Sequence, residues 1–260
     1  MILRRLTEHV KSQNWFAVGI EFVILVLGVF IGLQVQDWST ARETNARAEV
    51  FSERLLDDFR YEAWAYEYKL AYHKEVRVNA ERAANALTGK NPMNDDQFLI
   101  SAYRATQFIY YPQRRATFDE LIATGDIGLI RDDKLRETAV ILFSLTATEM
   151  NSQQSRISGY RTMFREITPI DVQSALLNRC GDRLVEPGNL TQIVGSLDYP
   201  CTLDLPNETL ASAAASLRAE QRLLPALQLR FADLESEIMD LETYNGELYQ
   251  DLREITANSP

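Results

Sequence analysis

The stretch WFAVGIEFVILVLGVFIGLQVQDW, residues 15–38, decides how the rest of the chain is placed. Phe22–Leu33 contains no polar side chain, and the wider window Trp15–Val35 has 21 residues with Glu21 as its one charge. At a rise of ~1.5 Å per residue, a helix over this window is about 31 Å long, close to the ~30 Å hydrocarbon core of a bilayer. Tryptophans stand at both ends of the stretch, where indole rings prefer the headgroup level. We therefore predict one transmembrane helix over residues 15–38, surrounded by the lipid bilayer.

The charges that flank this helix predict its orientation. Three basic residues precede it: Arg4, Arg5 and Lys11. Basic residues favour the cytoplasmic side of a membrane, although two arginines soon after the helix reduce the contrast. We expect residues 1–14 to form a cytoplasmic arm and residues 39–260 to lie outside the cytoplasm. A cleaved signal peptide is the alternative, but Leu33–Trp38 offers no small-x-small cleavage site, which favours a retained anchor.

Two features inside the apolar stretch bear on function. Glu21 is an ionisable group about a turn and a half from Trp15, and membrane carboxylates often mark a partner or a proton path. The alternative is that Glu21 lies at the headgroup level and reaches water. Gly28 and Gly32 form a small-xxx-small pair, which lets two helices approach closely. Glu21, Gly28 and Gly32 together indicate a membrane helix–helix contact, either with another protein or with a second copy of the chain.

The composition indicates one acidic, mainly α-helical domain after the anchor. The net charge is −10, and the first 38 residues contribute three basic and three acidic groups, so the excess lies in the remainder. An acidic surface of this kind argues against nucleic acid as a partner. About 220 residues follow the anchor, enough for one domain with its own core. Eleven glycines and eight prolines are few, which favours long helices over many strands joined by turns.

Apolar residues spaced by three and four predict a bundle of long antiparallel helices. Helices are expected over about 39–89, 95–109, 117–123, 132–167 and 168–180. The first has a buried stripe of Leu56, Phe59, Ala63, Tyr66, Leu70, His73, Arg77, Ala80, Ala84 and Leu87. It can run on from the membrane helix or restart at a capping box, Thr40–Glu43. In the middle of the fourth, Glu149 and Arg156 are either exposed or paired inside the bundle.

The last quarter of the chain divides into an irregular insert and a heptad helix. Periodicity disappears over residues 181–206, where glycine and proline are frequent. Residues 207–256 then carry a regular heptad, kinked at Pro225, with Asn245 as a polar residue in the seam. This helix can pack within its own bundle or form a coiled coil with another chain.

The two cysteines, Cys180 and Cys201, flank the irregular insert. If residues 39–260 lie in an oxidising periplasm, a disulfide between them is the natural reading. In the chain-entropy model a bridge of this span contributes ~3 kcal/mol. A metal site is a poor alternative, because no histidine or further cysteine accompanies the pair.

The sequence contains no motif for catalysis, and we expect no metal and no cofactor. His73 lies on a helix seam, where a lone histidine is more often a core residue than a ligand. There is no glycine-rich phosphate loop, no His-Glu-x-x-His and no nucleophile elbow. The first long helix carries an aromatic cluster: Tyr61, Trp64, Tyr66, Tyr68 and Tyr72. These rings either pack in the core or form an interaction surface, for which Tyr61, Trp64, Tyr68 and the seam residue Asn245 are the candidates.

Two stretches resemble a bacterial family catalogued as domain of unknown function 6090. The first is Gly19-Ile-Glu21 followed by Leu25–Gly28, Ile31–Gln34 and Trp38; the second is Thr117–Leu121 with Gly125, Leu129-Ile130 and Leu135-Arg136. The resemblance implies a short cytoplasmic arm, one membrane helix and a mostly helical outer domain. It therefore implies the bacterial inner membrane, with the main domain in the periplasm. Ser39 and the cysteine-flanked insert depart from the family pattern, and no activity is assigned to the family.

These observations favour a single-pass membrane protein whose helical domain binds other membrane or periplasmic proteins, for example as an accessory subunit of a larger complex. The alternative is a ligand-sensing ectodomain that signals through the transmembrane helix of a partner, because an arm of about 14 residues is too short for an output domain. A pocket lined by the aromatic cluster would favour the sensor. An enzyme is the least favoured class, and would require His73, Glu149 and Arg156 to meet in a deep cleft.

Overall fold

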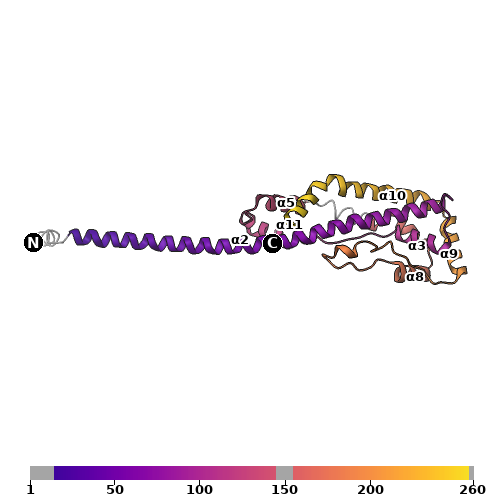
Figure 1. Ribbon diagram of the computed structural model, residues 1–260, viewed down its shortest axis with the longest axis horizontal. Helices are drawn as coiled ribbons and strands as arrows, with labels where there is room; N and C mark the ends of the chain where they lie inside the picture. The colour runs from indigo at the N-terminus through magenta and orange to yellow at the C-terminus, as the bar shows by residue number, and fades with distance from the viewer. Residues whose placement is uncertain (1–14, 145–154, 258–260) are drawn as a thin grey trace, which may run out of the picture. The chain divides into compact units, whose positions relative to one another are not determined.

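The computed structural model describes residues 15–144 and 155–257. These residues are mainly helical and contain no strand (Figure 1). The chain divides into two units, Met1–Ser52 and Glu53–Pro260, which are described separately below. The mainly α class predicted from the composition is confirmed.

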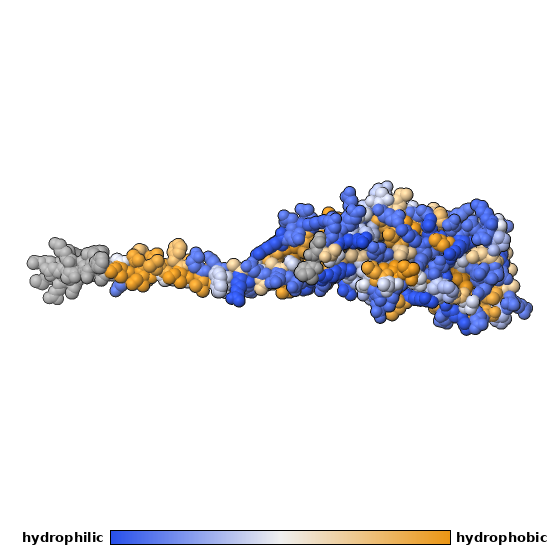
Figure 2. Space-filling model, in the orientation of Figure 1, coloured by the Kyte–Doolittle hydropathy of each residue, from blue (hydrophilic) through white to orange (hydrophobic). Residues whose placement is uncertain are grey.

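The first unit contains the N-terminal part of α2, a helix over Trp15–Leu87 that crosses the unit boundary at residue 52. Its large apolar side chains from Ile20 to Trp38 are exposed, and Figure 2 shows them as a continuous apolar segment. Among the described residues this is the one helix long and apolar enough to cross a membrane. The helix does not restart at Thr40, so the expected capping box is not used and the alternative of a helix running through is correct.

The second unit is built from the rest of α2 and a series of shorter helices. They are α3 (Asp95–Arg104), α4 (Ala116–Thr124), η1 (Asp126–Leu129), α5 (Asp133–Ser144), α7 (Gly159–Ile167), α8 (Ile170–Cys180), η2 (Leu190–Gln192), α9 (Asn207–Ala219), α10 (Leu223–Met239), η3 (Asp240–Tyr244) and α11 (Gly246–Ala257). In this unit α10 lies along one side of α2, and α8 with the irregular segment lies along the other (Figure 1). The helix α2 is therefore the centre of the core.

The buried face of α2 differs from the predicted stripe. Its buried apolar residues after position 52 are Leu55, Phe59, Trp64, Ala65, Tyr68, Tyr72, Val76, Ala80 and Ala83. Only Phe59 and Ala80 belong to the predicted set, whose other members are half-buried. The stripe is displaced by about one position, for example from His73 to Tyr72. The physical reason is that helices cover α2 on two sides, so a single stripe is too narrow to describe what is buried.

Helix ends follow local chemistry in most places. Gly89 and Gly125, expected as helix stops, both have a positive φ, +74° and +76°, which glycine adopts without strain. Asn94 caps α3 through a 2.8 Å bond from the Gln97 amide, and α3 ends at Arg104 instead of about 109. The helix α4 has no side-chain cap, and Thr117 is buried one residue inside it.

The helix predicted over 132–167 is interrupted. Asp132 accepts from the Leu135 amide at 3.0 Å and begins α5 as expected. The chain leaves helical conformation at Ile157 and Ser158, and Ser158 then caps α7 through the Arg161 amide at 3.2 Å. Arg156 is exposed, whereas Glu149 lies outside the described residues. The apolar spacing continues through this position, but a serine that caps a helix starts a new one here.

The single heptad helix predicted over 207–256 is wrong, because α9, α10, η3 and α11 replace it. The break falls at Glu220–Arg222, and Pro225 lies in the first turn of α10. A proline is tolerated there because the first amides of a helix have no intrahelical acceptor. The second break follows the π-helical turn η3, in which the carbonyl of the first residue, Asp240, accepts from Asn245. The heptad nevertheless predicts the buried face correctly, although it misses the breaks between helices. Its buried leucines include Leu210, Leu217, Leu227, Leu234 and Leu252.

Candidate functional site

Glu21, Gly28 and Gly32 occupy one face of the N-terminal part of α2. At 3.6 residues per turn, Glu21 lies ~20° and Gly32 ~40° from Gly28 around the helix, whereas Gly19 lies ~180° away. All three are exposed, and no atom of the described residues lies within 4 Å of a Cβ built on Gly28 or Gly32. The three residues that the sequence singled out therefore form a single open strip, with room for another helix.

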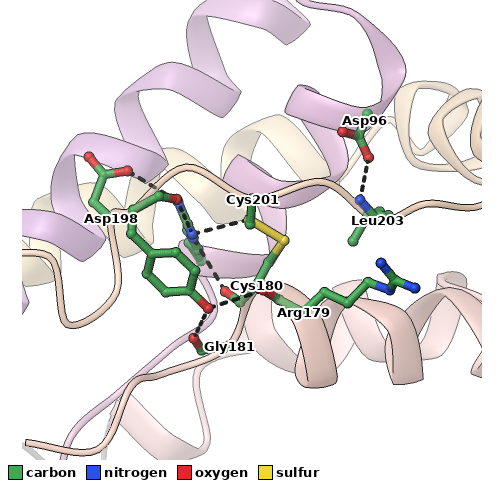
Figure 3. Close-up of a disulfide and its surroundings, with 9 residues drawn as sticks. Asp96, Arg179, Cys180, Gly181, Asp198, Cys201 and Leu203 are labelled. Carbon is green, nitrogen blue, oxygen red and sulfur yellow. Dashed lines mark hydrogen bonds and ion pairs between the residues drawn. A yellow bond between two sulfur atoms is a disulfide. The ribbon is translucent and has the colours of Figure 1, made fainter.

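The disulfide between Cys180 and Cys201 is present, as predicted, with Cα atoms 5.6 Å apart (Figure 3). It joins the end of α8 to the end of the irregular segment 181–206, which forms as expected. Around it, Arg104 at the end of α3 is buried and donates to the Tyr199 carbonyl at 2.7 Å and the Cys201 Sγ at 3.3 Å. The same guanidinium lies 3.2 Å from Asp198. Arg104 thus pairs its charge inside the domain, and because its Nε also donates to the Cys180 carbonyl at 3.4 Å, it contacts both ends of the bridge.

Carboxylates from two helices bind the backbone of the irregular segment. Glu75 on α2 accepts from the amides of Gly195 and Leu197, each at 2.9 Å, and of Asp198 at 3.1 Å. On the other side of the disulfide, Asp96 accepts from the Leu203 amide at 3.1 Å (Figure 3). A segment that lacks helical hydrogen bonds of its own receives its acceptors from these side chains.

The start of the irregular segment is fixed by a tyrosine. The Tyr72 hydroxyl lies 2.9 Å from both carboxylate oxygens of Asp182. Burial raises the pKa of the Asp182 carboxyl, and the hydroxyl bond opposes that rise. The segment is therefore tied to α2 at its start and at residues 195–198, which makes it a structural part of the domain.

The aromatic cluster is part of the core. Trp64 and Tyr68 are each only 3% exposed, so the prediction that they form an interaction surface is wrong. They pack against each other with ring centroids 5.6 Å apart and both contact Tyr111, a ring the sequence did not single out. Tyr61 is half-buried beneath Arg114, whose Cζ lies 4.0 Å from the ring centroid. The rings fill the space that an aromatic pocket would require.

Asn245, the fourth candidate for an interaction surface, has an internal role. It is half-buried, and its side-chain amide donates to the Asp240 carbonyl at 2.9 Å. Its backbone amide bonds the same carbonyl at 3.0 Å. Asn245 therefore closes the π-helical turn η3 instead of setting the register of a coiled coil.

A buried polar network lies between α2 and α10. Ser155 donates to Glu237 at 2.6 Å, and Arg230 donates to Ser155 at 3.0 Å and to the Gln107 carbonyl at 3.0 Å. His73 Nδ1 lies 3.4 Å from Glu237 Oε2, close enough for an ion pair. However, burial first and the Arg230 charge second lower the pKa of His73 to about 3. We therefore assign a neutral imidazole, which agrees with the sequence expectation of a core histidine.

The groups of this network pair with one another. The Ser155 hydroxyl donates to the Glu237 carboxylate and accepts from the Arg230 guanidinium. Burial raises the pKa of Glu237, and the Ser155 hydroxyl and Arg230 oppose that rise. The described residues also contain no group of three or more His, Cys, Asp or Glu side chains able to hold a metal ion.

A cavity of about 90 Å³ opens between α3, α7 and α8. It is lined by Tyr103, Thr106, Gln107, Arg161, Phe164, Arg165, Gln173 and Leu177. Sequence reasoning missed these residues, because the spacing predicts α7 only as the end of a long helix over 132–167. A signal was available in the spacing of Arg161 and Arg165, which places two cations on one helix face.

Comparisons of this chain with protein-family models, with curated proteins and with solved structures find no match.

Proposed function

We propose that this chain is a single-pass membrane protein whose helical outer domain acts as an interaction module. The observation that carries the proposal is the exposed apolar segment of α2 from Ile20 to Trp38. Leaving some 19 residues of apolar helix in water would be costly at roughly 25 cal/mol per Å², so lipid or another helix must cover them. The same segment is long enough to cross a bilayer.

The orientation that we propose places the N-terminus in the cytoplasm and residues 39–260 in the periplasm of a bacterium. The disulfide supports it, because such bonds persist in oxidising compartments and are rare in the cytosol. The basic residues before the helix support it independently. The resemblance to the family catalogued as domain of unknown function 6090 agrees with this arrangement, and we propose membership on the residues quoted above.

We further propose that the strip formed by Glu21, Gly28 and Gly32 contacts the membrane helix of another protein or of a second copy. Two glycines a turn apart let the backbones of two membrane helices approach closely, so contacts between the helices replace the contacts that each would make with lipid. A carboxylate on the same face has a reason to be there if a partner supplies its hydrogen-bond donor. An accessory subunit of a larger membrane complex would have these properties.

The test is photocrosslinking in native membranes with a photoreactive residue at position 28. The matched control is position 30, which is two residues away at the same depth but ~160° around the helix. We expect a discrete adduct from position 28 and none from position 30. Equal labelling at both positions, or lipid adducts alone, would contradict a specific helix partner.

The second candidate is a ligand-sensing ectodomain. The aromatic cluster does not support it, because those rings fill the core. The cavity beside Arg161 does support it, because hydrogen-bonding side chains form part of its lining. In this case signalling would pass through the membrane helix of a partner, so both candidates require the strip on α2.

A further inference from the structure

The cavity between α3, α7 and α8 presents unused positive charge. Arg161 donates through Nη1 to the Thr106 carbonyl at 2.9 Å, and its Cζ lies 4.8 Å from the Phe108 ring centroid. These contacts fix the guanidinium at the cavity wall. Among the described residues no partner engages its Nε or Nη2, so up to three N–H groups remain available.

Two more donors line the same cavity. Arg165, one turn along α7, is exposed, and its side chain has no ion pair within 4.0 Å in the described part of the chain. The Tyr103 hydroxyl likewise has no hydrogen-bond partner in residues 15–144 and 155–257, although the ring is only 8% exposed. Burial raises the pKa of Tyr103 to about 12, so the hydroxyl keeps its proton at neutral pH.

One carboxylate lies near this cluster. The charge of Asp182 acts on Arg161 and Tyr103, and its hydrogen bond is with the Tyr72 hydroxyl. Burial lowers the pKa of Arg161, and the neighbouring Arg165 lowers it further, as expected for two cations side by side. A bound anion would relieve the repulsion between these two cations.

The lining of the cavity also includes apolar side chains. Phe164 on α7 is buried, and Leu177 on α8 is 64% exposed. Ile170, one heptad earlier on the same face of α8, is 83% exposed. A lining that combines hydrogen-bond donors with hydrocarbon suits a ligand with two oxygens at one end and carbon at the other. Phosphate and sulfate have oxygens on all sides, and Phe164 and Leu177 offer these oxygens no donor.

We propose that this cavity binds a small organic carboxylate, with the carboxylate on Arg161, Arg165 and Tyr103 and a short apolar substituent on Phe164 and Leu177. A volume of about 90 Å³ is roughly three times the ~30 Å³ share of a water molecule. That space holds a carboxylate with a few carbons, and the substituent can extend along α8 toward Ile170. The site gives the sensor reading of the domain a ligand class, and it can be tested whether or not the membrane strip has a partner.

The experiment is isothermal titration calorimetry of the full chain in detergent with propanoate, butanoate and inorganic phosphate at constant ionic strength. We expect saturable one-to-one binding of the carboxylates, tighter for butanoate because it covers more of Leu177. Arg165→Gln should weaken binding at least tenfold, a loss of ~1.4 kcal/mol. Tyr103→Phe, which removes only the hydroxyl, should weaken it severalfold. Arg156→Gln is the matched control, since Arg156 is an exposed arginine that does not line the cavity.

Three results would overturn the proposal. One is the absence of saturable binding of either carboxylate up to tens of millimolar. Another is phosphate binding as tightly as butanoate, which would point to a general anion surface. The third is an equal loss of carboxylate affinity in Arg165→Gln and Arg156→Gln, which would mean that binding depends only on the net charge of the protein. Crosslinking at position 28 does not enter any of these outcomes, so the two proposals fail separately.

Discussion

Replacing Cys180 and Cys201 together by alanine should lower the stability of the second unit, which begins at Glu53, by about 3 kcal/mol. The bridge spans 21 residues, and the chain-entropy model gives ~3 kcal/mol for closing a loop of this length in the unfolded chain. For a domain of this size each kcal/mol corresponds to a change of about 2–4 °C in Tm, so the midpoint should fall by about 6–12 °C.

The folded state should change little. The amides of Gly195, Leu197 and Asp198 keep Glu75 as their acceptor, and Arg104 keeps the Tyr199 carbonyl and Asp198. Alanine is chosen because Cys180 is fully buried and a serine hydroxyl there would need a partner. The far-ultraviolet circular dichroism of the variant should therefore match that of the wild type at low temperature.

The assay is thermal unfolding of the full chain in detergent, followed by circular dichroism with and without reductant. The Tm of the wild type should fall by about 6–12 °C on reduction, at ~2–4 °C per kcal/mol. The Tm of the alanine variant should not change. An unchanged midpoint in both reduced wild type and variant would refute the reasoning. Loss of hydrogen-exchange protection at residues 195, 197 and 198 in the folded variant would also refute it, since the effect would then lie in the native state.

Three further predictions concern the α2 contacts and the end of α8. Glu75→Gln leaves one acceptor oxygen where Glu75 has two, and should lower the free energy of unfolding by about 2 kcal/mol. Hydrogen exchange at the amides of Gly195, Leu197 and Asp198 should be faster in this variant than in the control Glu81→Gln, which changes an exposed glutamate. Gly181→Ala should cost about 1–3 kcal/mol in denaturant unfolding, because its Cβ would lie 2.4 Å from the Leu177 carbonyl oxygen; a neutral result would show that α8 can end differently. His73 should make the fold acid-sensitive: its folded pKa of about 3 lies below the unfolded value of 6.5, so stability present above pH 6.5 is lost as the pH falls toward 3. The free energy of unfolding should fall by at most ~1.4 kcal/mol per pH unit on account of His73. Its measured dependence on pH should be smaller in His73→Gln if this residue is responsible.

The sequence was sufficient where a feature depends on near neighbours. The apolar run before Trp38, the glycine stops at Gly89 and Gly125, and the two cysteines around an aperiodic segment each have a local physical cause. The structure has the apolar helix, both left-handed glycines and the disulfide. Whether that helix spans a membrane stays a prediction.

The sequence was insufficient where distant segments decide the outcome. The stripe on α2 shifted because coverage by α10 and the irregular segment cannot be read from α2 alone. The C-terminal heptad was read as one helix, because Pro225 fits a first turn as well as a kink and the periodicity continues through Glu220–Arg222. Arg104 and Glu75 gave no signal, since an arginine at a helix end and a glutamate on a charged helix are ordinary. Only the tertiary fold brings backbone groups of residues 180–201 to them.

The position of α2 at the centre of the second unit also bears on how the chain folds. The Tyr66 hydroxyl bonds the Leu241 carbonyl 175 residues away, and the Tyr249 hydroxyl bonds Glu67 across 182 residues. Contacts this distant in sequence close long loops, and the entropy of loop closure is lost before any packing is gained. The Tyr66 ring, which stacks on Tyr249 of α11, is therefore covered only after the last helix has been made. Deleting α11 should leave a chain that is a substrate for chaperones and proteases, with an unfinished core.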